Sequence, residues 1–148
     1  MRIQNIMTTP VVTVEMDDML YTVKDIFDHL HFHHLPVVEN DCLQGMLSDR
    51  DLLKALSPSL GTLAETEKDL RTLKRRVHHI MTRDPVFLSP EDSVERAIKI
   101  FNAHTFSCIP VVDRDLHPVG MVSWRDIFKL LRRPAALDPE GVSIYGSN

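Results

Sequence analysis

The residues best suited to chemistry in this sequence form two copies of one short pattern. The first copy is "GMLSDRD", from Gly45 to Asp51, and the second is "GMVSWRD", from Gly120 to Asp126. Each combines a serine hydroxyl, an arginine and a carboxylate just after a glycine, a set that could serve catalysis or phosphate binding. The serine and aspartate spacing, S-x-x-D, is also that of a helix capping box.

A catalytic interpretation of this pattern is weak. Neither copy has the G-x-S-x-G turn that exposes a nucleophilic serine. A serine at a helix start also directs its hydroxyl at its own helix. We therefore expect the chain to have no catalytic residue and no enzymatic activity.

A phosphate and ribose interpretation suits the same side chains. A helix N-terminus offers free backbone N–H groups, the hydroxyl can bond phosphate or ribose, and the carboxylate can accept a ribose diol. An arginine nearby could neutralise phosphate charge. The candidate residues are Ser48, Arg50 and Asp51 in the first copy and Ser123, Arg125 and Asp126 in the second.

The rest of the chain repeats with almost the same offset. "IMTTPVVTV", which begins at Ile6, matches "IMTRDPVFL" at Ile80, and "HHLPVVEND" at His33 matches "SCIPVVDRD" at Ser107. The offset is 74 residues in these blocks and 75 at the glycine pattern, so the second copy has one extra residue near Pro118. Each copy has about 50 residues, below the usual self-sufficient size, so the two should bury their apolar faces together.

Each copy is predicted to have the order β-α-β-β-α. An extended stretch ("VVTV" or "VFL") precedes a helix, which in the second copy should be capped by Ser89 with Pro90 next. Two apolar runs separated by turn residues predict a hairpin, and a second helix follows the glycine pattern. The apolar stripes of the first helices are Leu20, Val23, Phe27 and Leu30, then Val94, Ala97, Ile98 and Phe101. The fold class is therefore α/β, of the α+β kind, with two pseudo-symmetric repeats packed through their sheets.

The predicted division of the chain is repeat one at 1–57, a linker helix at 58–78, repeat two at 79–133 and a disordered tail at 134–148. "TLAE", from Thr62, has capping-box spacing and favours a helix start in the linker. The apolar positions that follow have helical spacing; they are Leu70, Leu73, Val77 and Ile80. The "KRR" run at 74–76 is either a solvated face or a group that attracts phosphates.

Composition excludes several function classes. The net charge of −4 does not favour binding to nucleic acid or an anionic membrane. No apolar run is long enough to span a bilayer, and "MRIQNIMTTP" lacks the apolar region of a signal peptide. The two cysteines, Cys42 and Cys108, suggest a reduced, cytoplasmic protein.

With these blocks in order, the chain resembles a tandem pair of cystathionine-β-synthase (CBS) domains, a Bateman module. The resemblance rests on "IMT…P", "LPVVE"/"IPVVD" and G-x-x-S-x-R-D, each present twice over residues 1–132. The linker also resembles that of the CBS portion of acetoin-utilization accessory proteins. The resemblance implies a homodimeric, non-catalytic sensor of energy state or metabolites that regulates an enzyme or transporter. It would bind AMP, ADP, ATP or S-adenosylmethionine in clefts between the repeats.

The family pattern implies that each cleft takes adenine contacts from the opposite copy. Ser123 and Asp126 would act with Val12, Phe32 and His33, and Ser48 and Asp51 with Val86, Phe106 and Ser107. Met46 and Met121 would line the base pockets, although methionine is equally an ordinary core residue. The first copy has its proline one residue early and His33 where the second has Ser107. We therefore expect the two clefts to differ in affinity, and one can be empty.

Two alternatives accompany this hypothesis. "HLHFHH" contains His29, His31, His33 and His34, but its helix should end near His31 and the second copy lacks the cluster, so we expect no metal site. The apolar helix stripes could instead serve a ligand-independent dimerisation module that acts as a scaffold for a partner enzyme or transporter.

Overall fold

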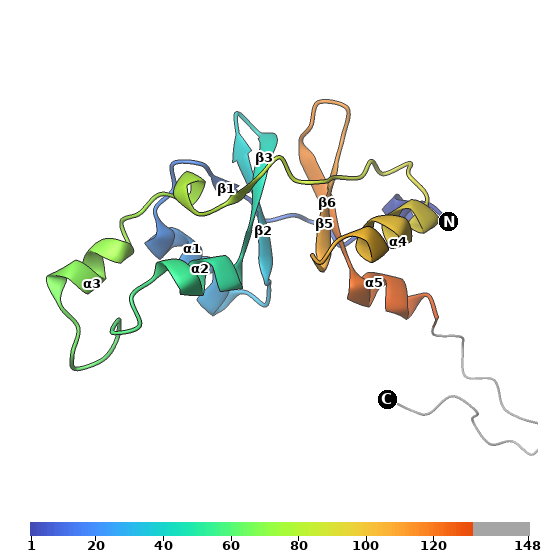
Figure 1. The fold of residues 1–148 in the computed structure, drawn as a ribbon. Coiled ribbons are helices and arrows are strands. Elements are labelled where there is room, and N and C mark those ends of the chain that lie inside the picture. The colour runs from blue at the N-terminus through green and yellow to red at the C-terminus, as the bar shows by residue number, and fades with distance from the viewer. Residues whose placement is uncertain (132–148) are drawn as a thin grey trace, which may run out of the picture.

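The computed structural model describes residues 1–131 and contains two β-hairpins that stand side by side, with helices on their outer sides (Figure 1). The first half contains the 3-10 turn η1 (Ile3–Asn5), β1 (Val14–Glu15), α1 (Leu20–His29), β2 (His34–Glu39), β3 (Cys42–Ser48) and α2 (Asp49–Ala55). The segment between the halves contains α3 (Glu67–Thr72), the 3-10 turn η2 (Val77–His79) and β4 (Thr82–Arg83). The second half contains α4 (Val94–Ala103), β5 (Cys108–Val112), β6 (Pro118–Ser123) and α5 (Trp124–Lys129).

Both predicted hairpins are confirmed. Strand β2 pairs antiparallel with β3, and β5 pairs antiparallel with β6. Each hairpin has a register shift at the same repeated position, between Val37 and Val38 and between Val111 and Val112. The mixed α+β class with two sheets is therefore as the sequence predicts.

The first helix of each repeat packs through its apolar stripe. Leu20 and Val23 of α1 are fully buried, as is Ala97 of α4. The predicted start of α4 is wrong, however: Ser93 is the cap and its Oγ accepts from the Arg96 N–H at 3.2 Å. Ser89 instead closes the preceding turn by donating its N–H to the Asp92 carboxylate, so the helix begins four residues later than expected.

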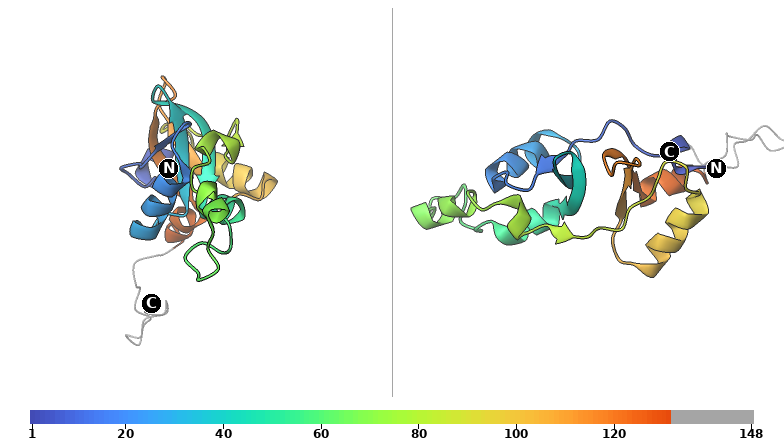
Figure 2. Two further views of the ribbon diagram at one scale, coloured as in Figure 1. Left: turned by 90° about the vertical axis from the view of Figure 1, so that its left-hand side faces the viewer. Right: turned by 90° about the horizontal axis from the view of Figure 1, so that it is seen from above.

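The two halves exchange their N-terminal segments, which the sequence did not predict. Ile3 is fully buried in the core of the second half, and Val77 is fully buried in the core of the first. Strand β4 joins the first sheet by pairing antiparallel with β3, whereas Thr8 forms a bridge to Met121 of β6. We call residues 1–13 and 75–87 the crossing segments, because each leads from one half to the other. They run along opposite sides of the hairpins (Figure 2, right). Residues 1–8 therefore pack with repeat two, although the sequence places them in repeat one.

Equivalent hydrogen bonds fix both crossing segments. The N–H of Leu20 donates to the carbonyl of Arg75 at 2.9 Å, and the N–H of Val94 donates to the carbonyl of Met1 at 3.1 Å. Both the donors and the acceptors differ by 74 positions, the offset of the repeat. The backbone of residue 1 and that of residue 75 therefore occupy the same place in the two halves.

The linker is less helical than predicted. The helix expected over 58–78 is present only as α3, followed after four residues by η2. Its capping box is formed by Thr66 and Asp69, and "TLAE" lies in turns before it. Val77 and Ile80 do not form a helical stripe with Leu70 and Leu73, because they pack against the first core instead.

Three further expectations from the sequence concern an extended stretch, the C-terminal tail and membrane spans. The extended stretch "VFL" forms a single parallel bridge, between Leu88 and Val111, instead of a strand. The expected disordered tail at 134–148 lies outside the described residues. Within residues 1–131, every helix is too short or too polar to cross a membrane.

Candidate functional site

The first glycine pattern forms a complete capping box at α2. Ser48 Oγ accepts from the Asp51 N–H at 3.1 Å, and the Ser48 N–H donates to Asp51 Oδ2 at 2.9 Å. The Asp49 N–H donates to the carbonyl of His33 at 3.0 Å. Three backbone amides at the start of α2 are thus already satisfied, and α2 has only seven residues. The bonds described at the Asp51 carboxylate use Oδ2 alone, and the residue is half-buried.

The second glycine pattern uses its carboxylate differently. Asp126 Oδ2 accepts from the Ser123 N–H at 2.8 Å and lies 3.2 Å from the Ser123 hydroxyl. Asp126 Oδ1 accepts from the Thr8 hydroxyl, which arrives on the crossing segment, at 3.4 Å. Asp126 is only 9% exposed. Both of its oxygens therefore have partners within the protein.

An open surface cavity of about 270 Å³ lies beside the first pattern. It is lined by Asp51, Lys54, Ala55, Arg75 and Ile80. Arg75 reaches over from the linker, where its Nη1 donates to the carbonyl of Ala55 at 3.5 Å. The cavity therefore combines one carboxylate with two cationic side chains from different segments.

The sequence analysis missed Lys54 and singled out Arg75 only as part of the "KRR" run. Lys54 lies three residues after Asp51, which is one turn along α2 and thus on the same helix face. That spacing was the available signal for Lys54. No spacing could reveal Arg75, because its place beside Asp51 depends on the path of the linker.

The two motif glycines are required by the protein itself. A Cβ at Gly45 would lie 2.7 Å from both Met81 Sδ and the carbonyl oxygen of Thr82. A Cβ at Gly120 would lie 2.5 Å from Met7 Sδ. The crossing segments thus occupy the space beside both glycines, and a side chain there would collide with the protein itself.

The crossing segments carry two of the residues expected to contact adenine, Val12 and Val86. Val86 follows β4, which pairs with β3, and Val12 follows the Thr8 bridge to β6. Val12 packs against the first core, and Phe106 packs against the second while its ring stacks on His104 at 4.8 Å. Val86 is 36% exposed.

The remaining predicted residues lie on strands, turns and helix starts. Met46 and Met121 are half-buried on β3 and β6, opposite the crossing segments, and Phe32 is half-buried before β2. The exposed members of the set are His33, Arg50, Ser107 and Arg125. The Ser107 carbonyl accepts from the Trp124 N–H at 3.3 Å, as that of His33 does from Asp49.

The histidine cluster does not share a helix face. Helix α1 ends at His29, so the i, i+4 geometry with His33 does not form. His33 Nδ1 lies 2.8 Å from Asp49 Oδ2 instead.

Burial is the main cause that lowers the pKa of His34, which pairs with Ser48 on β3. Its counterpart is Cys108, where burial and then the charge of Asp126 raise the thiol pKa to about 12.

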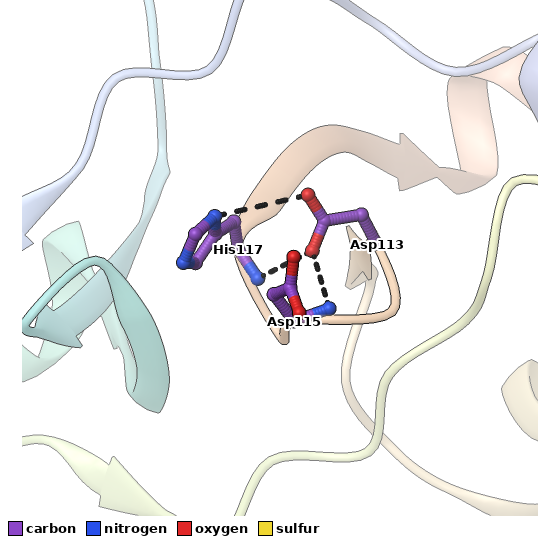
Figure 3. Close-up of side chains that lie close together, drawn as sticks. All are labelled: Asp113, Asp115 and His117. Atoms are coloured by element: carbon purple, nitrogen blue, oxygen red, sulfur yellow. Dashed lines mark hydrogen bonds and ion pairs between the residues drawn. The ribbon is translucent and has the colours of Figure 1, made fainter.

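A second set of candidate metal ligands lies in the β5–β6 turn (Figure 3). Asp113, Asp115 and His117 bring their ligand atoms within 4.8 Å of one another. Asp113 Oδ1, however, accepts from the backbone N–H groups of Asp115 at 2.9 Å and His117 at 3.0 Å. Closing the turn explains this cluster without an ion.

A family model identifies the class of protein that this fold and these paired patterns define. The model described as CBS domain matches residues 3–58 and 77–133, which is more than half of the chain. The chain therefore belongs to the CBS domain family and carries two copies of the domain in tandem.

Curated relatives include both stand-alone and multidomain proteins. A CBS domain-containing protein of Dictyostelium discoideum is 31% identical over 133 residues, which cover 87% of this chain and 90% of the relative. The homoserine O-acetyltransferase of Methanococcoides burtonii is 28% identical over 130 residues, 87% of this chain but 24% of the enzyme. The chain thus spans about a quarter of that enzyme's length.

Solved structures share the fold. The CBS domain of a membrane protein from Sphaerobacter thermophilus has a TM-score of 0.75 and 34% identity, with 88% of each chain covered. The CBS domain pair of protein MJ0100, in complex with 5'-methylthioadenosine and S-adenosyl-L-methionine, has a TM-score of 0.69 and 24% identity, with 88% and 95% covered. An acetoin utilization protein (AcuB) from Vibrio cholerae has a TM-score of 0.71 and 23% identity, with 88% and 90% covered.

Proposed function

We propose that the chain is a non-catalytic regulatory module that binds an adenine nucleotide or an adenosyl compound in the cleft beside Asp51. The observation that carries this proposal is the cavity that Asp51 lines together with Arg75 from the linker. The MJ0100 domain pair, whose fold this chain shares, was solved with two adenosyl ligands. The ligands proposed are AMP, ADP, ATP or S-adenosylmethionine.

The Asp51 carboxylate would accept a ribose diol in this cleft. Its Oδ2 already holds the Ser48 N–H at 2.9 Å, which fixes the orientation of the carboxylate and directs its second oxygen away from that amide. A carboxylate is a strong acceptor for two neighbouring hydroxyls because the bonds are charge-assisted. Arg50, exposed on the first turn of α2, would lie near the phosphate end.

The residues that line the cavity belong to the first half and the linker, so a ligand would reach repeat two through Phe106 and Ser107. Strand β4 follows the linker and pairs with β3, and Val86 follows three residues later on the path to repeat two. Phe106 and Ser107 would complete the base side from repeat two. Binding can therefore change how the halves pack, provided that the ligand has different affinities for two arrangements.

The pseudo-symmetric cleft beside Ser123 and Asp126 is the second proposed site. Its set would be Met121, Arg125, Val12, Phe32 and His33, with Met46 serving the first site. The Thr8 hydroxyl already occupies Asp126 Oδ1. A ligand there must displace that bond, so we expect weaker occupancy.

A ligand-independent dimerisation module is the second candidate function. Large apolar side chains are exposed on the helices that flank the hairpins: Leu53 is 72% exposed on α2, Phe128 58% on α5 and Tyr21 56% on α1. Burying such side chains in a homodimer would remove apolar surface from water. Sedimentation with and without nucleotide distinguishes the candidates, because a scaffold would dimerise and bind its partner equally in both.

The regulated partner would be a cytoplasmic enzyme or a transporter. The homoserine O-acetyltransferase relative matches this chain over only a quarter of its length. The Sphaerobacter thermophilus structure is the CBS domain of a membrane protein. These relatives support a module that serves a larger system.

Thermal unfolding with each of the four ligands tests the proposal. A ligand at 100 times its Kd adds about 2.7 kcal/mol to the unfolding free energy, so millimolar nucleotide should raise the Tm clearly. Asp51→Asn should reduce this shift. Asp69→Asn is the matched control, because Asp69 closes the capping box of α3 and does not line the cavity. No stabilisation by any ligand, or equal shifts in wild type and Asp51→Asn, would contradict the proposal.

A further inference from the structure

The two clefts differ in the residues that would meet the phosphate end of a ligand. Among the residues that line the cavity beside Asp51, Arg75 corresponds to Met1 through the offset of 74, and Ala55 corresponds to Leu130 through the offset of 75. Lys54 corresponds to Lys129 and keeps its charge. One half therefore has two cationic side chains and a small one, whereas the other has one cationic side chain and two larger apolar side chains.

The structure supports the equivalence of these positions. The carbonyl of Arg75 accepts from the Leu20 N–H in the same way as the carbonyl of Met1 accepts from the Val94 N–H. The side chains of residues 75 and 1 therefore leave the backbone at equivalent places. The side chains of Arg75 and Met1 differ in charge and hydrogen-bond donors at one structural position, so the comparison concerns a single side chain.

The carboxylates add a second difference. Asp126 is 9% exposed and is bonded through both oxygens, one of them to Thr8. Asp51 is half-buried, lines the cavity and is bonded through Oδ2 alone among the interactions described for it. The cleft with more positive charge is thus also the one whose carboxylate is open to a diol.

From these differences we propose that the module sorts adenosine compounds by charge. The Asp51 cleft selects a nucleotide with a di- or triphosphate, whose phosphate chain is held between Lys54 and Arg75. The guanidinium can donate two parallel hydrogen bonds to phosphate oxygens, and the ammonium contributes a point charge. The Asp126 cleft lacks the guanidinium and therefore gains less affinity from added phosphates. This inference rests on the proposed function and adds the class of ligand.

Isothermal titration of the full chain with adenosine, AMP, ADP and ATP tests the inference. The wild-type affinity should rise with each phosphate, and the gain should shrink at high salt because exposed charges are screened. Arg75→Met copies the residue of the second half. It should weaken ATP about tenfold, equivalent to about 1.4 kcal/mol, and change adenosine less than about twofold.

Matched variants separate local from general charge effects. Lys54→Met should weaken ATP as Arg75→Met does, because Lys54 lines the same cavity. Lys129→Met changes the equivalent position of α5, and Arg71→Met removes an exposed cation from α3; both should leave ATP affinity within about twofold of wild type. An equal loss of ATP in all four variants would overturn the inference, because a general charge effect would then explain it.

The outcomes also separate this inference from the proposed function. If adenosine and ATP bind wild type equally, or if Arg75→Met weakens both to the same extent, charge sorting is wrong and nucleotide binding stands. If no adenosine compound binds wild type at millimolar concentration, the proposed function fails and charge sorting fails with it.

Discussion

Asp51 and Asp126 end the same seven-residue pattern in the two halves and close the same kind of capping box, yet their carboxylates differ in availability. Thr8, on one crossing segment, bonds to Asp126 and helps to bury it. Arg75, at the start of the other crossing segment, lines a cavity beside Asp51. The comparison shows that the repeated pattern specifies the cap, whereas segments from elsewhere in the chain decide which carboxylate can bind a ligand.

The largest expected effect concerns the exchange of segments that creates this difference. Ile3→Ala should lower the unfolding free energy by about 2–5 kcal/mol, because it leaves a cavity in the core of the second half. Trp124, the single tryptophan, packs against the same core and stacks on Phe101 at 4.9 Å. Urea unfolding followed by its fluorescence should show an earlier transition.

Val77→Ala is the companion of this variant, because Val77 fills the equivalent place in the first core. It should destabilise the protein with less direct change at Trp124. A transition of Ile3→Ala within about 0.5 kcal/mol of wild type would show that the first crossing segment does not stabilise the second half.

The motif glycines provide the next comparison. Gly45→Ala should cost about 2–3 kcal/mol, because its Cβ would meet the rigid carbonyl oxygen of Thr82 as well as Met81 Sδ. Gly120→Ala should cost about 1 kcal/mol, because its Cβ would meet only the flexible side chain of Met7. Urea midpoints measure both, and equal costs would contradict the assignment of the rigid contact to the first half.

Met7→Ala provides the control for the second glycine. It should relieve the clash in the Gly120→Ala background, so that the two changes together cost less than the sum of their separate effects. Strict additivity would mean that Met7 does not restrict this glycine.

The pH dependence of stability gives a smaller contrast between the halves. Burial lowers the pKa of His34 below the ordinary value of 6.5. As the pH drops through about 6.5, the unfolded chain therefore binds a proton at this histidine before the folded chain does, and the unfolding free energy falls. The charged groups that act on His34 are Asp49, His33, Asp51 and Arg50. The pKa of Cys108 rises from 9.0 to about 12, so this thiol makes stability fall above about pH 9.

Replacing each of the two side chains in turn tests this contrast. His34→Cys should flatten the urea midpoint between pH 5 and 7, a range set by the ordinary histidine pKa of about 6.5. Cys108→Ala should flatten it above pH 9, the thiol's ordinary value. The exposed His31 serves as control through His31→Gln. An acid limb that survives in His34→Cys and disappears in His31→Gln would reverse the assignment.

Local pattern was enough to predict the elements that local chemistry determines. Apolar runs with turn residues between them predicted both hairpins, and the serine and aspartate spacing predicted the caps at Ser48 and Ser123. The cap of α4 was misassigned because "SPEDS" offers two serines, and the turn that Asp92 closes selects the later one, Ser93. Pattern alone does not weigh such a local competition.

Long-range placement was not predictable in the same way. Ile3 and Val77 match each other in the repeat, but nothing in their spacing shows that each belongs to the other half's core. The cavity beside Asp51 depends on the same placement, since Arg75 precedes the turn that carries Val77. Sequence spacing therefore identified Asp51 and could not identify Arg75, the linker residue that lines the cavity.

The most direct test of the central claim compares ADP binding to Asp51→Asn and Asp126→Asn by isothermal titration, with Trp124 fluorescence confirming that each variant is folded. The account predicts that Asp51→Asn weakens ADP about tenfold or more, because a charge-assisted bond to the ribose is lost. It also predicts that Asp126→Asn stays within about twofold of wild type, because Asp126 already bonds within the protein. Equal losses in the two variants, or a larger loss in Asp126→Asn, would contradict the claim that the Asp51 cleft is the principal nucleotide site.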